Sequence, residues 1–99
     1  RLVMISNGQH ILTFDAEQGQ LKEFELETAP TGWLDGFMLT NVVDGKLVVR
    51  DFDGENRREL MKVKDGYAAM VTSNDNYLYY VVECGTEVES RSCLQRDRL

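Results

Sequence analysis

The chain has 99 residues, 42% of them hydrophobic, and a formal net charge of −6 from 17 acidic and 11 basic side chains. This size allows one small domain or a piece of a larger one, and the hydrophobic content excludes a disordered chain. The negative charge argues against nucleic-acid binding, and no apolar run approaches the roughly 20 residues that span a bilayer.

Turn signals separate short runs of β-favouring residues along the whole chain. Asn-Gly and Asp-Gly pairs tolerate the positive φ angles of tight hairpin turns, so the pattern predicts a series of hairpins. The predicted strands are residues 2–6, 10–15, 21–27, 33–34, 37–42, 47–52, 58–62, 67–72, 77–83 and 93–99. The turn signals are Asn7-Gly8, Asp35-Gly36, Asp44-Gly45, Asp53-Gly54, Asp65-Gly66 and Asp75-Asn76.

Two segments do not follow this simple pattern. Residues 28–32 carry the single proline and are predicted to form a loop. Residues 55–64 contain good helix formers and are the best candidate for a helix. Because an Asp-Gly turn lies on each side of this short run, a strand is favoured there.

The turn signals also recur at a longer period. Gly8 and Gly45 each separate a first apolar run from a second, and Asp35 and Asp75 each precede a strongly apolar run. Both spacings are close to the roughly 40-residue repeat of propeller blades. Some runs, such as 77–82, are apolar on both faces, as inner strands between neighbouring blades should be.

The sequence therefore predicts an all-β fold of antiparallel β-propeller blades. About two and a half blades would form a partial propeller, a single segment over residues 1–99 with units of roughly 1–31, 32–63 and 64–99. The middle unit would hold four strands, while the first would lack its innermost strand and the third its outermost.

Two segments of the chain resemble the repeats of TolB-like propellers. VDGKLVVRDFDGENRREL, at residues 43–60, resembles the inner-hairpin-to-outer-strand signature of that family. GYAAMVTSNDNYLYYVVE, at residues 66–83, resembles its Ser-Pro-Asp-Gly step before a tyrosine-rich strand. Similar repeats occur beside PEGA domains in bacterial surface proteins. The resemblance implies a propeller fold and a place at the bacterial cell surface.

The two cysteines, Cys84 and Cys93, bracket a polar loop that contains glycine and serine. If the flanking runs pair as a hairpin, the two sulfurs lie at the base of the loop within reach of a disulfide. A disulfide at this place suits an extracytoplasmic or cell-surface protein, and the alternative is two reduced, partly buried thiols. Zinc is not expected, because His10 is distant in sequence and the usual spacing of ligand cysteines is absent.

The sequence offers no residue that we assign to catalysis, cofactor binding or metal binding. His10 is the only histidine and no G-x-S-x-G elbow occurs, so we interpret it as a surface residue at a strand end. Asp51, Asp53 and Glu55 resemble a calcium loop in composition, but their spacing lacks the acidic ligand at the twelfth EF-hand position. A hairpin turn explains them better.

Aromatic side chains are expected mainly to fill the space between blades. Trp33 is the exception, because it lies at the junction of a loop and a strand, and we predict a surface contact with a partner there. The aromatic set is Trp33, Phe37, Phe52, Tyr67, Tyr77, Tyr79 and Tyr80.

These patterns favour a non-catalytic β-propeller segment that serves as a protein-binding or scaffolding module and needs no cofactor. The chain begins inside an apolar run, which we interpret as the start of an excised or processed segment. One alternative is the propeller portion of a larger, peptidase-type enzyme whose catalytic residues lie outside this segment. Another is a small β-domain that associates with copies of itself.

The expected partners follow from the incomplete blades. Such blades leave exposed strand edges, which invite pairing with a protein partner or with a second copy of the chain. Neither nucleic acid nor direct insertion of this segment into a membrane is expected.

Overall fold

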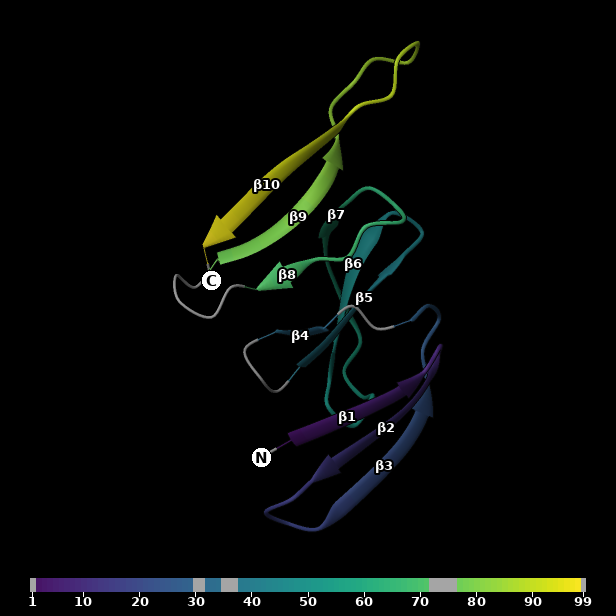
Figure 1. The fold of residues 1–99 in the computed structure, drawn as a ribbon, viewed down its shortest axis with the longest axis vertical. Helices are drawn as coiled ribbons and strands as arrows, with labels where there is room; N and C mark the ends of the chain where they lie inside the picture. The colour runs from purple at the N-terminus through teal and green to yellow at the C-terminus, as the bar shows by residue number, and fades with distance from the viewer. Residues whose placement is uncertain (1, 30–31, 35–37, 72–76, 99) are drawn as a thin grey trace.

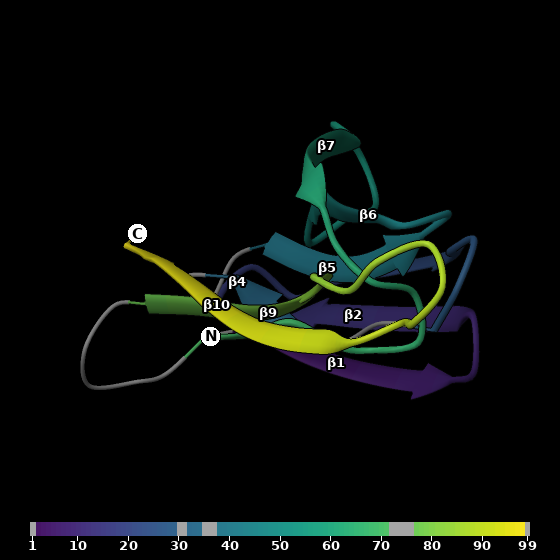
Figure 2. The same cartoon turned by 90° about the horizontal axis from the view of Figure 1, so that it is seen from above.

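The structure of the chain, a computed structural model, describes residues 2–29, 32–34, 38–71 and 77–98. Within these ranges the chain forms ten strands in three small antiparallel sheets, which confirms the prediction of an all-β fold. Figure 1 shows the sheets layered along the longest of the molecule's 51 × 29 × 20 Å extents. In Figure 2, which looks along that axis, the two end sheets overlap in projection and β7 lies to one side.

The N-terminal sheet, sheet A, is a meander of three strands. Its strands are β1 (Leu2–Asn7), β2 (His10–Asp15) and β3 (Gln20–Glu25). Gly8 takes the first position of the two-residue turn between β1 and β2 with a φ of 64°, which glycine adopts without strain. The strand predicted over 21–27 ends at Glu25, because Leu26 turns into the core and its backbone N–H donates to the carbonyl of Gln9 at 2.9 Å.

The middle sheet, sheet B, has four strands in chain order. They are β4 (Gly32–Leu34), β5 (Met38–Val43), β6 (Lys46–Asp51) and β7 (Arg58–Lys62). Asp44 and Gly45 have φ values of 49° and 73°, as a type I′ hairpin turn between β5 and β6 requires. The helix alternative for residues 55–64 is wrong, because β7 occupies this run and pairs with β6.

The C-terminal sheet, sheet C, has the order β10-β9-β8. Its strands are β8 (Met70–Val71), β9 (Tyr77–Glu83) and β10 (Ser92–Arg98). The strand predicted over 67–72 begins too early, since residues 67–69 are not in a strand and β8 begins at Met70, which pairs with Tyr79 of β9. Residue 72 lies outside the described residues. The predicted turns Asp35-Gly36 and Asp75-Asn76 lie outside the described residues.

Sheet B is covered on both faces by the other two sheets. Its face toward sheet A packs in the cluster Ile11, Leu26 and Leu39, and its opposite face packs against sheet C. The second cluster contains the buried residues Leu34, Leu47, Val49, Ala69, Leu78 and Tyr80. Coverage on both faces explains why consecutive residues are buried along β5 and β6, instead of every second residue.

The aromatic side chains are less buried than expected from the sequence. Among the described members of the set only Tyr80 is buried, while Tyr67 is 46% exposed. Trp33, Phe52, Tyr77 and Tyr79 are half-buried, and Phe37 lies outside the described residues. The expectation that most of these rings fill the core is therefore wrong. Tyr77 and Tyr79 lie on the open face of sheet C, and Phe52 and Tyr67 lie in loops outside the strands.

Candidate functional site

A loop closed by a disulfide projects beyond sheet C, where it connects β9 to β10 (Figure 1). The disulfide joins Cys84 and Cys93, whose Cα atoms are 5.9 Å apart. Directly before it, Glu83 pairs with Ser92 at the end of the β9–β10 ladder. The hairpin expected from the sequence thus brings the two cysteines together at the base of the loop.

The carboxylate of Glu83 organises the interior of this loop. One of its oxygens accepts hydrogen bonds from the backbone N–H groups of Arg91, at 2.8 Å, and Gly85, at 3.0 Å. The other accepts one from the hydroxyl of Ser90 at 2.7 Å. These bonds, led by that from Arg91, lower the pKa of Glu83 to about 2. Both ends of the loop are thereby tied to one side chain.

Lys64 fastens the loop to the chain that leaves sheet B. Its ammonium donates to the hydroxyls of Ser92, at 2.8 Å, and Ser90, at 3.2 Å, and lies 3.2 Å from the Glu83 carboxylate. Its backbone N–H donates to the carbonyl of Val81 at 2.7 Å. The position of the loop is therefore fixed relative to sheets B and C together.

Gly85 lies where the two arms of the loop come closest. A Cβ atom at this position would lie 2.1 Å from the carbonyl oxygen of Glu89 and 2.7 Å from the backbone nitrogen of Arg91. Both neighbours are backbone atoms that cannot rotate away. Glycine is thus required at residue 85 by the close approach of the backbone.

The far end of the loop presents an apolar side chain between two acids. The backbone N–H of Thr86 donates to the carbonyl of Glu89 at 2.9 Å, and the Thr86 hydroxyl accepts from the Glu89 N–H at 3.1 Å. Val88 lies within this turn and is 97% exposed, with Glu87 and Glu89 on either side of it. Because the loop is held at its base and its tip, a partner could bind it with little loss of chain entropy.

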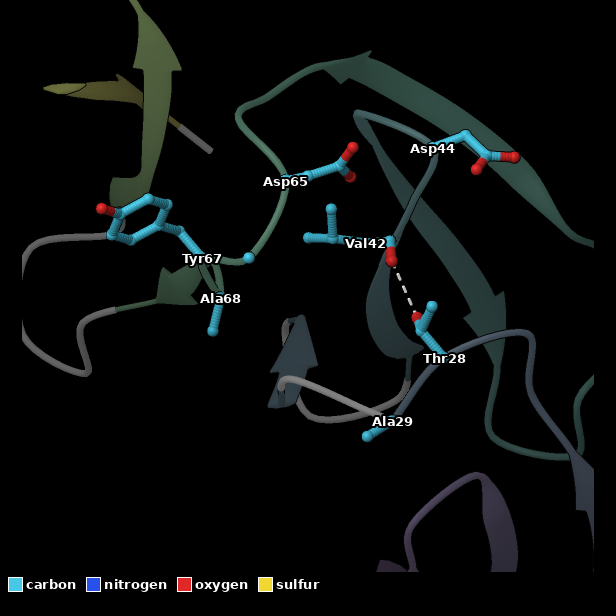
Figure 3. A pocket seen from close by; sticks show the side chains of 8 residues that line it. Thr28, Ala29, Val42, Asp44, Asp65, Tyr67 and Ala68 are labelled. Carbon is cyan, nitrogen blue, oxygen red and sulfur yellow. Dashed lines mark hydrogen bonds between the residues drawn. The ribbon is translucent and has the colours of Figure 1, made fainter. Parts of the chain in front are cut away.

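An open pocket of about 540 Å³ lies between the loop after β3, the β5–β6 turn and the segment before β8. Figure 3 shows the Thr28 hydroxyl donating to the carbonyl of Val42, a bond of 2.7 Å. Asp65 accepts a bond of 2.6 Å from the backbone N–H of Gly45, and Asp44 extends away from Tyr67. The polar groups named here mainly hold neighbouring turns together, which is a structural role.

An ion-pair network holds the exit of sheet A against sheet B. Arg50, only 9% exposed, donates to the Glu27 carboxylate at 2.8 Å, and Arg57 donates to the same oxygen at 2.7 Å. The bond from Arg50 is the largest of the interactions that lower the pKa of Glu27 to about 2. Removing a charged side chain from water is costly, so such groups are buried where an opposite charge pairs with them. The charges of this network are used in linking the two sheets, which is a structural role.

His10 and the acidic residues 51, 53 and 55 make contacts that stabilise the fold. The Nε2 atom of His10 lies 2.5 Å from Glu23, and this contact raises the pKa of the imidazole. Asp53 accepts a hydrogen bond of 3.1 Å from the backbone N–H of Glu55, and Asp51 accepts one of 2.6 Å from the Asn56 side chain. Asp51 at the end of β6 and Asp53 and Glu55 in the turn that follows thus shape the connection between β6 and β7.

Trp33 lies in β4 and is half-buried against the cluster between sheets A and B. Part of the indole therefore serves the core, and its predicted contact with a partner stays a prediction. Of the residues singled out in the sequence, Cys84 and Cys93 are brought together, whereas Trp33 and His10 belong to different elements. Neither residue lies in the loop between Cys84 and Cys93, which we call the stapled loop.

Sequence reasoning did not single out Glu83, Lys64 and Gly85, the residues that shape this loop. The position of Glu83 beside Cys84 and that of Gly85 just inside the disulfide were the available signals. Lys64 had no such signal, because its contacts with Ser90 and Ser92 join segments distant in sequence.

Comparisons with protein-family models, curated proteins and solved structures found no match to this chain. The described residues contain no helix long and apolar enough to cross a membrane. They also contain no cluster of three or more histidine, cysteine, aspartate or glutamate side chains arranged to hold a metal ion.

Proposed function

We propose that the chain is a non-catalytic segment of β-propeller blades that binds a protein partner through the stapled loop, outside the cytoplasm at a bacterial cell surface. The observation that carries this proposal is the loop between Cys84 and Cys93, which is fixed at its base and exposes Val88 at its tip. Rigid loops at the end of a β-scaffold are common sites of protein recognition.

The blade assignment rests on how the sheets are ordered. Each of the three sequence units contains one antiparallel sheet, and the middle one has four strands in simple meander order. The first strand of sheet B, β4, contacts the first strand of sheet C, β8, as innermost strands of adjacent blades would. Stacked meanders of this kind, together with the resemblance of residues 43–60 and 66–83 to TolB-like repeats, support a partial propeller.

The location proposed for the chain rests on its disulfide, since such bonds persist in oxidising compartments. Cells that produce the chain can be quenched with acid and treated with a maleimide before and after reduction. We expect Cys84 and Cys93 to react only after reduction. Labelling of both thiols without reductant would contradict an extracytoplasmic location.

The binding role can be tested by replacing Val88 with a photo-crosslinking amino acid in cells that produce the chain. We expect light to produce an adduct between residue 88 and a protein other than this chain. The same substitution at Gln18, in an exposed turn of sheet A, is the control and should not give that adduct. Adding Gly85→Ala should abolish the adduct, because it opens the loop. The proposal fails if residue 88 gives no adduct, or if residue 18 gives the same one.

A further inference from the structure

The outward face of sheet A is apolar but uncovered. Cross-strand partners share a face of a sheet, so the register places Val3, Ile5, Leu12, Phe14 and Leu21 together on the side away from sheet B. Ile5 and Leu21 are each 64% exposed, and Val3 is 44% exposed. We call these five residues, together with His10, Glu23 and Glu25, the acidic end face.

The outward face of sheet C has a similar apolar character. By the same alternation, Tyr77, Tyr79 and Val81 of β9 share a face with Leu94 of β10, on the side opposite to the buried Leu78 and Tyr80. Glu83 lies on this side too, at the base of the loop, where its carboxylate is 3.2 Å from the Lys64 ammonium. Leu94 is 69% exposed. We call Tyr77, Tyr79, Val81, Leu94, Arg96 and Arg98 the basic end face.

The molecule exposes more surface than a compact protein of its size. Its accessible area is 6610 Å², whereas a compact monomer of 11.3 kDa exposes about 5,700 Å². The strands of the end sheets are as apolar as those of sheet B, but only sheet B is covered on both sides. Apolar sheet faces of this kind mark surfaces that another sheet covers.

The charges around the two faces are of opposite sign. On the acidic end face, Glu23 and Glu25 lie on either side of His10, which is 2.5 Å and 3.6 Å from them. On the basic end face, the guanidinium groups of Arg96 and Arg98 lie 4.1 Å and 5.7 Å from the centre of the Tyr77 ring. The faces thus match in polarity as well as in apolar content.

We propose that a second copy of this chain stacks its basic end face on the acidic end face of the first. Contact between two acidic faces would bring together four carboxylates and two His10 rings, and contact between two basic faces would bring together four guanidinium groups. The head-to-tail arrangement instead sets the two arginines of one copy against the two glutamates of the other. A heterologous contact of this kind builds a closed ring or an open filament, depending on its rotation.

This stacking continues the packing already present within one chain, where sheet B covers one face of each end sheet. It differs from pairing between strand edges, because side chains of sheet faces form the contact and no backbone ladder is added. It also does not involve Val88 or the rest of the stapled loop, so it stands or falls separately from the proposed binding of a partner there.

Sedimentation equilibrium of the wild-type chain and of two variants tests the proposal. Ile5→Asp blocks the acidic end face, and Leu94→Arg blocks the basic end face, each by burying an extra charge of the sign already there. We expect the wild type to form oligomers larger than dimers, and each variant alone to associate at least about tenfold more weakly. An equal mixture of the two variants should form a dimer, because each retains the face that the other has lost.

Leu60→Glu is the matched control, since Leu60 is an exposed leucine on sheet B and belongs to neither end face. It should associate like the wild type. Circular dichroism checks that every variant is folded, and Leu21→Asp replaces Ile5→Asp if the latter unfolds.

Three results would overturn the proposal: a wild-type chain that stays monomeric at millimolar concentration, single variants that associate like the wild type, or a mixture that stays monomeric. The second result would favour pairing through strand edges.

A charge exchange gives an independent measurement. Replacing Glu23 and Glu25 with lysine should weaken association, and replacing Arg96 and Arg98 with glutamate in the same chain should restore it. If the quadruple variant associates no better than the double variant, these charges do not meet across a contact.

Discussion

At the scale of single residues, Gly54 controls how closely sheet B approaches sheet A. Its φ is 87°, and a Cβ atom there would lie 2.9 Å from the Phe24 ring of β3. Gly8 has a similar φ of 64° but no atom near the position of a Cβ. An alanine at Gly8 would therefore cause backbone strain alone, whereas an alanine at Gly54 would add a steric clash with Phe24.

We predict that Gly54→Ala lowers the free energy of unfolding by about 2–3 kcal/mol, and Gly8→Ala by about 1 kcal/mol. Urea denaturation followed by circular dichroism measures both. In a chain that also carries Phe24→Leu, which replaces the ring with a smaller side chain, the two alanine substitutions should lower the unfolding free energy by nearly the same amount. Equal destabilisation by the two alanines would contradict the role assigned to the Phe24 contact.

A second prediction at this scale concerns Glu27 and pH. The pKa of Glu27 in the folded chain is about 2, below its ordinary 4.5, chiefly because of Arg50. A carboxylate with a lowered pKa contributes its full stabilisation above pH 4.5 and loses it as the pH falls toward 2. Glu27→Gln should therefore flatten the pH dependence of the unfolding free energy in this window.

Unfolding by urea at a series of pH values measures this effect. Glu87→Gln, in the exposed loop, is the control and should keep the wild-type pH profile. Glu83 also titrates near pH 2 in the folded chain, so the profile of the Glu27 variant should retain some slope. A Glu27 variant with an unchanged profile would contradict the assignment.

At the scale of elements, the β9–β10 hairpin combines two separate restraints, the disulfide and the Glu83 hydrogen bonds. Replacing both cysteines with serine should cost about 2–3 kcal/mol, because the closed loop is short. Glu83→Gln should leave the disulfide intact but loosen the arms of the loop.

Amide hydrogen exchange at Gly85 and Arg91 measures the second effect, since both N–H groups donate to Glu83. We expect faster exchange at these two sites in Glu83→Gln, with unchanged exchange in β2 of sheet A. Protection that survives Glu83→Gln would mean that the disulfide alone orders the loop.

Several elements could be predicted from the sequence because their signals are local. The type I′ turn at Asp44-Gly45 and the two-residue turn at Gly8 follow from the φ angles that these residues tolerate. The end of β3 and the start of β8 could not be predicted, because they depend on Leu26 entering the core and on where the neighbouring strand is available for pairing.

At the scale of the whole molecule, sheets A and C each depend on sheet B. The two core clusters lie on opposite faces of sheet B, so each end sheet can lose its packing while the other keeps it. Stability then resembles that of a repeat protein, in which units are coupled only to their neighbours.

We predict that Leu78→Ala, which removes a side chain only 2% exposed from the cluster between sheets B and C, costs about 2–5 kcal/mol. Native-state hydrogen exchange should show the loss mainly in β9 and β10, with β2 still protected. The matched substitution Leu39→Ala, in the other cluster, should reverse this pattern. Uniform loss of protection in both variants would mean that the three sheets unfold as one unit.

The sequence by itself determined the all-β character of the chain, most of its hairpins and the position of Cys84 and Cys93 at the base of one loop, since these depend on turn preferences and side-chain alternation over a few residues. That the two cysteines form a disulfide was left open by the sequence and came from the structure. Only the tertiary structure decided that Glu83 and Lys64 hold that loop, that Arg50 is buried against Glu27, and that one face of each end sheet is left open. These features arise where segments distant in sequence meet, and short-range preferences carry no information about which distant segments meet.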